Sequence, residues 1–303
     1  MDFKFECYNI IIQIPRGKIS TFRELAIALG DVVAAKAVYH TITSKDFPVD
    51  APVHRVVSIE GRVFSERQKT LLNDEGIVIK NDKIENLEDL LFSEFQSSRP
   101  LEQLKKYQIE LSKKITLTDR TELSKIQTIG GTDLKFQGNS AIGAIVLVEY
   151  PSNKIIEERT VEMKLDFPYI PTYLSYREGA VIKKLYERIE QRCDILFIDG
   201  SGIVHPRFLG IAAHIGAERN IATIGLSKSL LCGQLKCGAR DVDEIYIGDR
   251  LCGYAVYQSK RKRFYFSPGN HVSLETCKYF AEQVNRGWIP PTVIAHKYLQ
   301  SLK

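Results

Sequence analysis

The spacing of apolar and polar positions changes along this chain, and the change divides it into two parts. In the first part, apolar residues recur at helical spacing over Phe5 to Gln13 and over Val32 to Ile42. Ser20-Thr21 followed by Glu24 resembles a capping box ahead of another apolar face, and Gly30 is a typical helix stop. These signals predict a small, mainly helical first part.

The second part alternates between strand and helix patterns. The short apolar run from Asp194 to Ile198 ends in Asp199-Gly200, which is typical of a buried strand with a carboxylate at its C-terminal end. Such alternation predicts an α/β sheet, whose functional residues gather at the carboxyl ends of the strands. The other predicted elements are helices at Leu101 to Ile115, Tyr176 to Ile189 and Leu274 to Asn285, and strands at Ala141 to Glu149, Ile155 to Met163 and Ile221 to Leu226.

A polar stretch from Asn81 to Pro100 separates the two parts. It ends in Gln-Ser-Ser-Arg-Pro, and serine and proline resist helix continuation. We therefore expect a first domain at residues 1–88, a linker at residues 89–100 and a second domain at residues 101–303.

Composition narrows the class of protein. The 303 residues suit two domains of roughly 150 residues each, and 44% hydrophobic with 26% charged residues excludes wholesale disorder. We expect a cytoplasmic protein, because the chain lacks both a membrane-length apolar run and the basic start of a signal peptide. The six cysteines form no CxxC pair, which favours reduced structural thiols. A net charge of +5 permits a polyanionic partner without requiring one.

Asp133, Glu178 and Asp199 stand out among the acids by their positions. Asp133 follows Gly130-Gly131-Thr132 near the start of the predicted sheet, Glu178 opens a predicted helix, and Asp199 ends the most apolar strand. Carboxylates that converge at strand ends can hold Mg²⁺, which can generate hydroxide and stabilise charge on a phosphate. Spacing alone favours the alternative, in which Asp199 caps a turn and Glu178 merely begins a helix.

Several short sequence motifs, which follow one another along the chain, favour metal binding by these acids over the structural alternative. Phe167-Pro168-Tyr169-Ile170-Pro171 precedes Tyr173 to Gly179, and Asp199 to Arg207 reads Asp-Gly-Ser-Gly-Ile-Val-His-Pro-Arg. The later blocks are Gly210-Ile211-Ala212 with His214-Ile215-Gly216, Thr223 to Lys228, His271 to Leu274, and Pro291-Thr292 with Ala295-His296. From about Leu101 to the C-terminus, the chain resembles the endonuclease V family. The resemblance implies a ribonuclease-H-like mixed sheet flanked by helices, and an endonuclease that uses Mg²⁺, with Mn²⁺ as an alternative.

The resemblance also implies a substrate and roles for individual residues. The family cuts the second phosphodiester bond 3′ to a deaminated base, chiefly deoxyinosine. Asp133, Glu178 and Asp199 match its metal-binding acids, and Lys228 and His296 match its other active-site positions. Residues matching those at the DNA and lesion are Pro168, Tyr169, Ile170, Pro171, Leu174, Gly200, His205, Ile211, Gly225 and Leu231.

The segment 168–171 suits a DNA wedge physically. Its two prolines stiffen the loop, and the ring of Tyr169 can fill the gap left by an extruded base. The alternative is a buried turn between a strand and a helix. Thr172 stands where the family usually has glycine, which leaves base selectivity open. The basic run 260–263 is interpreted as a solvated turn, with phosphate contact as the alternative.

The first part carries blocks of a different family: Ile14 to Phe22, Ala34 to Val38, Pro52 to Val57, and Leu71-Leu72 with Glu75-Gly76. Over about residues 3 to 80, it resembles the DNA-binding domain of the O6-alkylguanine-DNA alkyltransferases, which implies a winged helix-turn-helix-like domain. Val53 replaces the acceptor cysteine, so the thiolate that alkyl transfer needs is missing. Phe22, Lys36 and Arg55 occupy DNA-binding positions of the family; loss of DNA binding is the alternative.

Together these resemblances predict a DNA repair endonuclease acting on damaged double-stranded DNA. Two alternatives stay open. One is an endoribonuclease specific for inosine in RNA, and the other is a non-enzymatic binder of damaged DNA. Single-stranded DNA or RNA is the alternative partner to double-stranded DNA. The intact acids argue against a pure binder. Neither the lesion range nor the oligomeric state follows from the sequence.

Overall fold

The computed structural model describes residues 1–238, 242–257 and 263–302, and the chain divides into two compact units. Unit 1 comprises residues 1–106 together with 166–171, and unit 2 comprises residues 107–165 and 172–303. The boundary falls inside α6 (Pro100–Ser112), the helix that was predicted to open the second domain.

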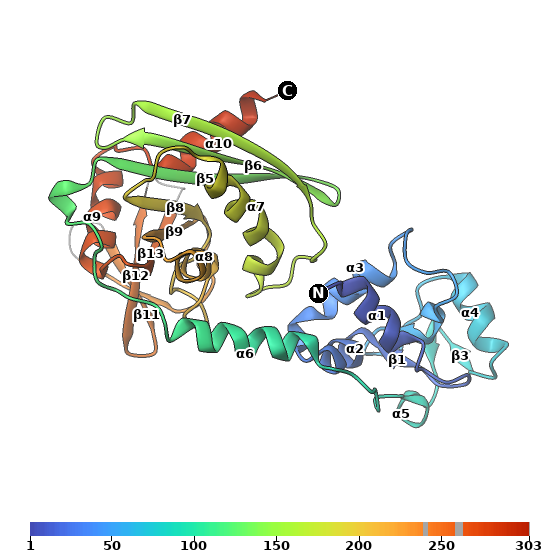
Figure 1. The fold of residues 1–303 in the computed structure, drawn as a ribbon. Helices are drawn as coiled ribbons and strands as arrows, with labels where there is room; N and C mark the ends of the chain where they lie inside the picture. Colours follow the sequence, from blue (N-terminus) through green and yellow to red (C-terminus); the bar gives the residue numbers. More distant parts are fainter. Residues whose placement is uncertain (239–241, 258–262, 303) are drawn as a thin grey trace. The chain divides into compact units, whose positions relative to one another are not determined.

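Unit 1 is mainly helical, as the apolar spacing predicted (Figure 1). Thr21 caps α2 by accepting a hydrogen bond from the Glu24 amide at 3.1 Å, and Gly30 ends that helix in the left-handed region at φ 104°. The third predicted helix begins instead as a 3-10 turn, because Asp31 caps the Val33 amide. The helices are α1 (Phe3–Ile11), α2 (Phe22–Leu29), α3 (Ala35–Ile42), α4 (Glu66–Asn73) and α5 (Leu87–Leu90).

Short strand pairs complete unit 1. β1 (Ser20–Thr21) lies parallel to β2 (Val56–Val57), and β3 (Ile79–Lys80) lies antiparallel to β4 (Lys83–Ile84). Leu91, in the segment predicted as a linker, forms a bridge with Ile19 and packs against the core of the unit. The first residues of that segment are therefore part of unit 1.

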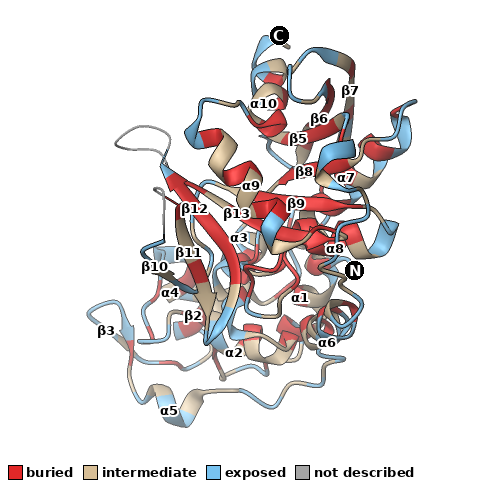
Figure 2. Ribbon diagram, turned by 90° about the vertical axis from the view of Figure 1, so that its left-hand side faces the viewer, coloured by how far each residue is buried: buried red, intermediate tan, exposed pale blue. Residues whose placement is uncertain are grey.

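Unit 2 is built on a mixed sheet. The described strands follow the order β10-β11-β12-β13-β9-β8-β5-β6-β7, in which β5, β8 and β9 are parallel and the other neighbours are antiparallel. Figure 2 shows the central strands of this sheet as buried. Their bounds are β5 (Thr128–Gln137), β6 (Ser140–Glu149), β7 (Ile155–Lys164), β8 (Ile195–Asp199), β9 (Thr223–Ser227), β10 (Gln234–Lys236), β11 (Val242–Ile247), β12 (Arg250–Tyr257) and β13 (Arg263–Asn270).

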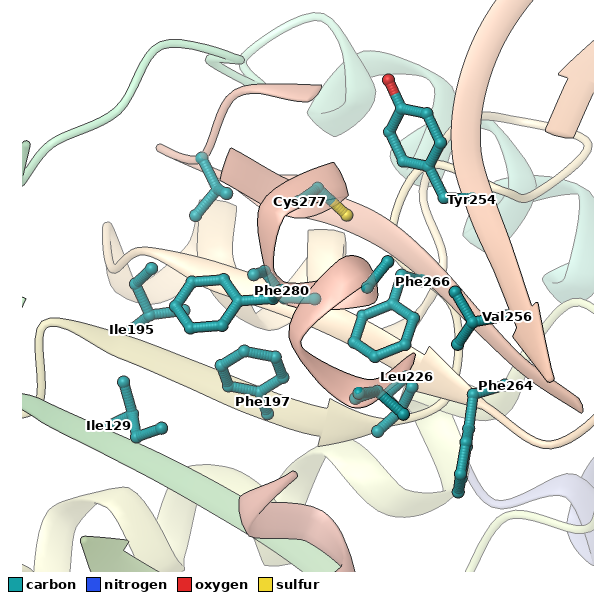
Figure 3. Close-up of a cluster of buried hydrophobic side chains, with 14 of the residues drawn as sticks. Ile129, Ile195, Phe197, Leu226, Tyr254, Val256, Phe264, Phe266, Cys277 and Phe280 are labelled. Atoms are coloured by element: carbon teal, nitrogen blue, oxygen red, sulfur yellow. The ribbon is translucent and has the colours of Figure 1, made fainter. Parts of the chain in front are cut away.

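Helices cover both faces of the sheet, which confirms the predicted α/β class. Alternate residues of β8 explain how: Leu196 packs in the core that holds residues of α7 and α8, whereas Phe197 packs in the core that holds α9. The Phe197 and Phe280 rings meet edge to face with centroids 5.1 Å apart (Figure 3). These helices are α7 (Leu174–Arg188), α8 (Ile211–Arg219), α9 (Leu274–Asn285) and α10 (Pro291–Ser301).

Unit 2 agrees with the sequence prediction in some elements and differs from it in others. The antiparallel strands β10 to β13 were not predicted, whereas α9 has the bounds that were predicted for it. Of the basic run 260–263, residues 260–262 lie outside the described residues, and Arg263 opens β13. No helix in the described ranges is long and apolar enough to cross a membrane.

Candidate active site

Asp133 and Asp199 lie side by side on two neighbouring interior strands of the sheet in unit 2. Thr132 of β5 pairs in parallel register with Ile198 of β8, so the next residue of each strand lies at the same level and points to the same face of the sheet. Asp133 is 6% exposed. Burial raises the pKa of Asp133 to about 6, and the neighbouring Asp199 carboxyl group adds to the rise, although a hydrogen bond with His296 opposes it.

Glu178 belongs to the same electrostatic group. It lies early in α7 and is 9% exposed. Burial raises the pKa of its carboxyl group to about 7; the charges of Asp199 and Asp133 act in the same direction, and the charge of Arg177 opposes them. Three acids from different elements therefore share one poorly solvated region.

Two basic side chains contact the aspartates. Lys228 follows β9, the parallel neighbour of β8, and its Nζ donates a hydrogen bond to Asp199 Oδ2 at 2.8 Å. Burial lowers the pKa of Lys228, but the contact with Asp199 and the charge of Asp133 outweigh this effect and raise it. His296 on α10 places its Nδ1 2.8 Å from Asp133 Oδ2, and its side chain remains 48% exposed.

The approach of α10 to β5 depends on a missing side chain. A Cβ atom on Gly131 would lie 2.2 Å from the carbonyl carbon of Pro291, the first residue of α10. Only glycine permits this contact, and it brings the helix close enough for His296 to reach Asp133. Of the predicted residues, Asp133, Asp199, Lys228 and His296 are in contact, and Glu178 lies near enough for the charges of both aspartates to affect it.

The donor set of this cluster suits a divalent cation. Carboxylate oxygens are the ligands that Mg²⁺ prefers, and a cation would neutralise acids that burial and mutual repulsion now force toward protonation. Within the described residues, however, no group of three or more His, Cys, Asp or Glu side chains is gathered closely enough to hold a metal ion. Asp133 and Asp199 form the assembled pair, and their charges help to raise the pKa of the Glu178 carboxyl group.

Several residues predicted at the lesion converge beside this pair. Gly200 has φ 136°, and a Cβ atom there would lie 2.4 Å from Ile211 Cγ2 and 3.7 Å from Leu174 Cδ2. A Cβ atom on Gly225 would lie 2.6 Å from the Gly200 carbonyl oxygen. Leu231 follows β9 and is 40% exposed. Glycine backbone and apolar side chains therefore meet directly after Asp199.

The predicted wedge and His205 have different environments. Tyr169 is 61% exposed, Pro168 is half-buried, Pro171 is exposed and Ile170 is buried. His205 is 2% exposed, and its Nε2 lies 3.0 Å from the Thr172 carbonyl oxygen. Because it faces Thr172 inside the protein, its predicted contact with DNA stays a prediction.

Gln108 was not assigned a role at the site, and Arg207 was expected, within His205-Pro206-Arg207, to contact the DNA strand near the cut. Both side chains contact Thr172. A sequence signal for Gln108 existed. It takes an apolar position of the helical pattern between Leu104 and Leu111, where a polar residue needs a buried partner.

The substituted position in unit 1 sits beside an ion-pair cluster. Val53 is half-buried, and the next residue, His54, places Nε2 2.9 Å from Glu75 Oε1. Arg55 binds Glu75 through Nε and Nη2 and also donates to the Ile14 carbonyl oxygen. Because its guanidinium is engaged internally, the predicted DNA contact of Arg55 stays a prediction.

Aromatic rings gather around Phe22. Its centroid lies 5.2 Å from that of Tyr39 and 5.8 Å from that of Phe64, which is 52% exposed. Neither Tyr39 nor Phe64 was predicted as a site residue. Lys36 lies exposed on α3.

Comparison with known proteins decides the family. Residues 109–297 match the family described as Endonuclease V. This chain belongs to the endonuclease V family. Residues 2–77 match the DNA-binding domain of 6-O-methylguanine DNA methyltransferase, so this endonuclease V carries an alkyltransferase-like DNA-binding domain ahead of its nuclease unit.

Relatives with the same two-part organisation span nearly the full length. A protein of Picrophilus torridus, described as a bifunctional methyltransferase/endonuclease, is 32% identical, covering 98% of this chain and 95% of the relative. A bifunctional methyltransferase-like/endonuclease of Nanoarchaeum equitans is 34% identical, covering 96% and 88%. The solved endonuclease V of Ciona intestinalis, in complex with DNA containing an inosine followed by a ribo-adenosine, matches with a TM-score of 0.59 and 25% identity, covering 67% of this chain and 99% of that one.

Proposed function

We propose that this endonuclease V recognises deaminated bases, chiefly deoxyinosine, in double-stranded DNA and hydrolyses the second phosphodiester bond 3′ to the lesion. The observation that carries the proposal is the paired carboxylates of Asp133 and Asp199, with Lys228 and His296 each bound to one of them. Membership of the family and the inosine-containing DNA bound to the Ciona relative support it.

Asp133, Glu178 and Asp199 would hold the metal ion, Mg²⁺ or alternatively Mn²⁺. When bound, such an ion lowers the pKa of water and stabilises negative charge on a phosphate. The protein contributes the arrangement of the acids: β5 and β8 place two of them in register, and α7 supplies the third.

Lys228 would stabilise negative charge at the phosphate, and His296 would transfer a proton there. The Lys228 ammonium, now on Asp199 Oδ2, lies where it can stabilise negative charge that develops during cleavage. Asp133 holds His296 through Nδ1, which leaves Nε2 to accept or release a proton. Half of this imidazole is exposed, so a substrate can reach it.

The region after Asp199 would receive the displaced base. Gly225 lets the backbone of residues 200–202 pack closely against β9. As the family resemblance implies, the backbone at Gly200 and Gly225 would face the base edge, and Ile211 and Leu174 would supply an apolar face. Tyr169, exposed between Pro168 and Pro171, would fill the gap in the base stack.

Unit 1 would serve as a DNA-binding or lesion-binding module and not as an alkyltransferase. Valine at position 53 supplies no thiolate, so no alkyl group can be accepted there. A second binding module on the same chain raises the effective concentration of DNA at the nuclease unit when both can bind one duplex.

The test is nicking of an end-labelled duplex with one deoxyinosine, with Mg²⁺ and with a chelator. We expect one Mg²⁺-dependent cut one nucleotide 3′ of the lesion, and no cut by the Asp199→Asn variant, although that variant still binds the duplex. Asp249→Asn, in an exposed turn between β11 and β12, is the matched control and should cut normally. Cutting by Asp199→Asn at the wild-type rate would refute the assigned chemistry.

A second substrate class is favoured by one observation: the DNA bound to the Ciona relative carries a ribo-adenosine directly after the inosine. An endoribonuclease specific for inosine would use the same acids on RNA. Matched DNA and RNA strands with one inosine distinguish the two substrates, because the preferred one is cut faster under identical conditions.

A further inference from the structure

Thr172, which directly follows the segment 168–171, adopts a backbone conformation that needs support. Its φ of 69° lies in the left-handed region, which residues with a Cβ atom rarely adopt. Side chains from two other parts of unit 2 contact this residue: Gln108 from α6, and His205 and Arg207 from the loop after β8.

These side chains converge on the Thr172 carbonyl oxygen. Gln108 Nε2 donates to it at 3.1 Å, Arg207 Nη2 donates at 2.6 Å, and His205 Nε2 lies 3.0 Å away. Arg207 Nη2 also donates to the Thr172 hydroxyl oxygen at 2.8 Å. A glycine at position 172 could offer the carbonyl oxygen but not this second acceptor.

The donors also hold one another. Arg207 Nε donates to Gln108 Oε1 at 2.8 Å, and the Arg207 guanidinium lies 4.8 Å from the centre of the Tyr173 ring. The Arg207 backbone amide donates to His205 Nδ1 at 3.1 Å, so the ring proton is on Nε2, the atom that faces the Thr172 carbonyl oxygen.

Two of the side chains that contact Thr172 are buried, so water does not compete for their hydrogen bonds. Gln108 is 1% exposed and His205 is 2% exposed. Burial lowers the pKa of His205 to about 3, and the charge of Arg207 acts in the same direction, so the neutral form with its proton on Nε2 persists at neutral pH. The loop that carries His205 and Arg207 begins at Asp199, so the same segment carries a catalytic acid and the contacts to Thr172.

We propose that Gln108, His205 and Arg207 form a clamp on Thr172 that holds the segment 168–171 in the conformation needed to displace the lesion. The clamp residues are positioning residues, because they act through Thr172 on Tyr169. This inference rests on the proposed function, because it concerns how the protein holds the segment 168–171 that would act as the DNA wedge. The proposal also explains the threonine at position 172, because its hydroxyl oxygen accepts a hydrogen bond from Arg207 that a glycine could not accept.

The test compares Thr172→Ala, which removes the hydroxyl group, with Thr172→Ser, which keeps it. Full-length variants in the Asp199→Asn background are titrated with a duplex that carries 2-aminopurine beside deoxyinosine, whose fluorescence rises when the neighbouring base leaves the stack. We expect Thr172→Ala to shift the equilibrium toward the stacked lesion by about tenfold, the loss typical of one hydrogen bond to a charged group. Thr172→Ser should restore most of the signal, and Arg207→Lys, which lacks the planar fork, should resemble Thr172→Ala.

A purely structural role is separated by repeating Thr172→Ala in a Tyr169→Ala background. If the clamp acts through Tyr169, the tenfold shift in the stacking equilibrium caused by Thr172→Ala should fall below about twofold once Tyr169→Ala has removed the ring. A shift of equal size in both backgrounds, or equal signals from Thr172→Ala and Thr172→Ser, would overturn the proposal. Nicking of the same duplex by the chain with Asp199 intact reports separately on the proposed function, so a clamp that behaves as expected without nicking would refute only that function.

Discussion

Glu75 provides a direct test of how unit 1 is held together. Its carboxylate accepts hydrogen bonds from Arg55 and from the Gly17 amide and contacts His54, while its side chain is only 8% exposed. Burial alone would raise the pKa of Glu75, but the hydrogen bonds from Arg55, His54 and Gly17 outweigh it and lower the pKa from 4.5 to about 2.

The contribution of Glu75 to the stability of unit 1 follows from this lowering of its pKa. A shift of that size at 1.36 kcal/mol per pKa unit corresponds to about 3 kcal/mol of stability for unit 1. Because the folded pKa is the lower one, this contribution is fully present above the unfolded pKa of 4.5 and is lost as the pH falls toward 2. The perturbation is Glu75→Gln, which keeps the shape of the side chain but removes its charge and the titration.

The assay is peptide-level hydrogen exchange of α1, α2 and α3 in the full-length chain, measured for both proteins at each pH. Comparing them at equal pH cancels the intrinsic pH dependence of exchange and the other titrating groups. We expect Glu75→Gln to lower the opening free energy by about 3 kcal/mol at pH 7 and by almost nothing at pH 2. Glu88→Gln, exposed in the same unit, is the control and should resemble wild type. A gap between wild type and Glu75→Gln that stays constant between pH 5 and pH 2 would refute the assigned electrostatics.

Two further predictions concern packing and thiols. Gly131→Ala should lower the melting temperature of unit 2 by several degrees, because the new Cβ atom would lie 2.2 Å from the Pro291 backbone. The fluorescence of Trp288 reports this unfolding transition. An unchanged midpoint would contradict the packing of α10 against β5. Of the six cysteines, Cys237 is exposed, whereas burial raises the pKa of Cys277 and of other interior thiols. A thiol reagent should therefore modify one cysteine rapidly in the native protein, and Cys237→Ser should abolish that phase; its persistence would contradict the assigned exposure.

Signals that depend on a few neighbouring residues were predicted correctly from the sequence. The Thr21 cap, the Gly30 stop and the bounds of α9 depend on backbone groups within one or two helical turns. The position of Asp199 at the end of β8 follows from the same local reasoning, because a short apolar run before an acid has one simple interpretation in an α/β protein.

The antiparallel strands β10 to β13 were missed for different reasons. β10 reads Gln-Leu-Lys, which gives no clear strand pattern, whereas β11, β12 and β13 carry β-branched and aromatic residues interrupted by glycine, proline or acids. A strand of this kind is stabilised by the strands beside it more than by its own residues.

The sequence established which reactive groups the chain contains, and its resemblance to two families supplied the expected roles of the acids, of Lys228 and of the missing thiol at Val53. The sequence did not establish how these groups assemble. His296 reaches Asp133 because Gly131 lets α10 pack closely against β5, and Arg207 hydrogen-bonds to both Thr172 and the buried Gln108. Tertiary structure decides these contacts, because each joins residues far apart in the chain, and its geometry depends on backbone approach and burial that no local pattern specifies.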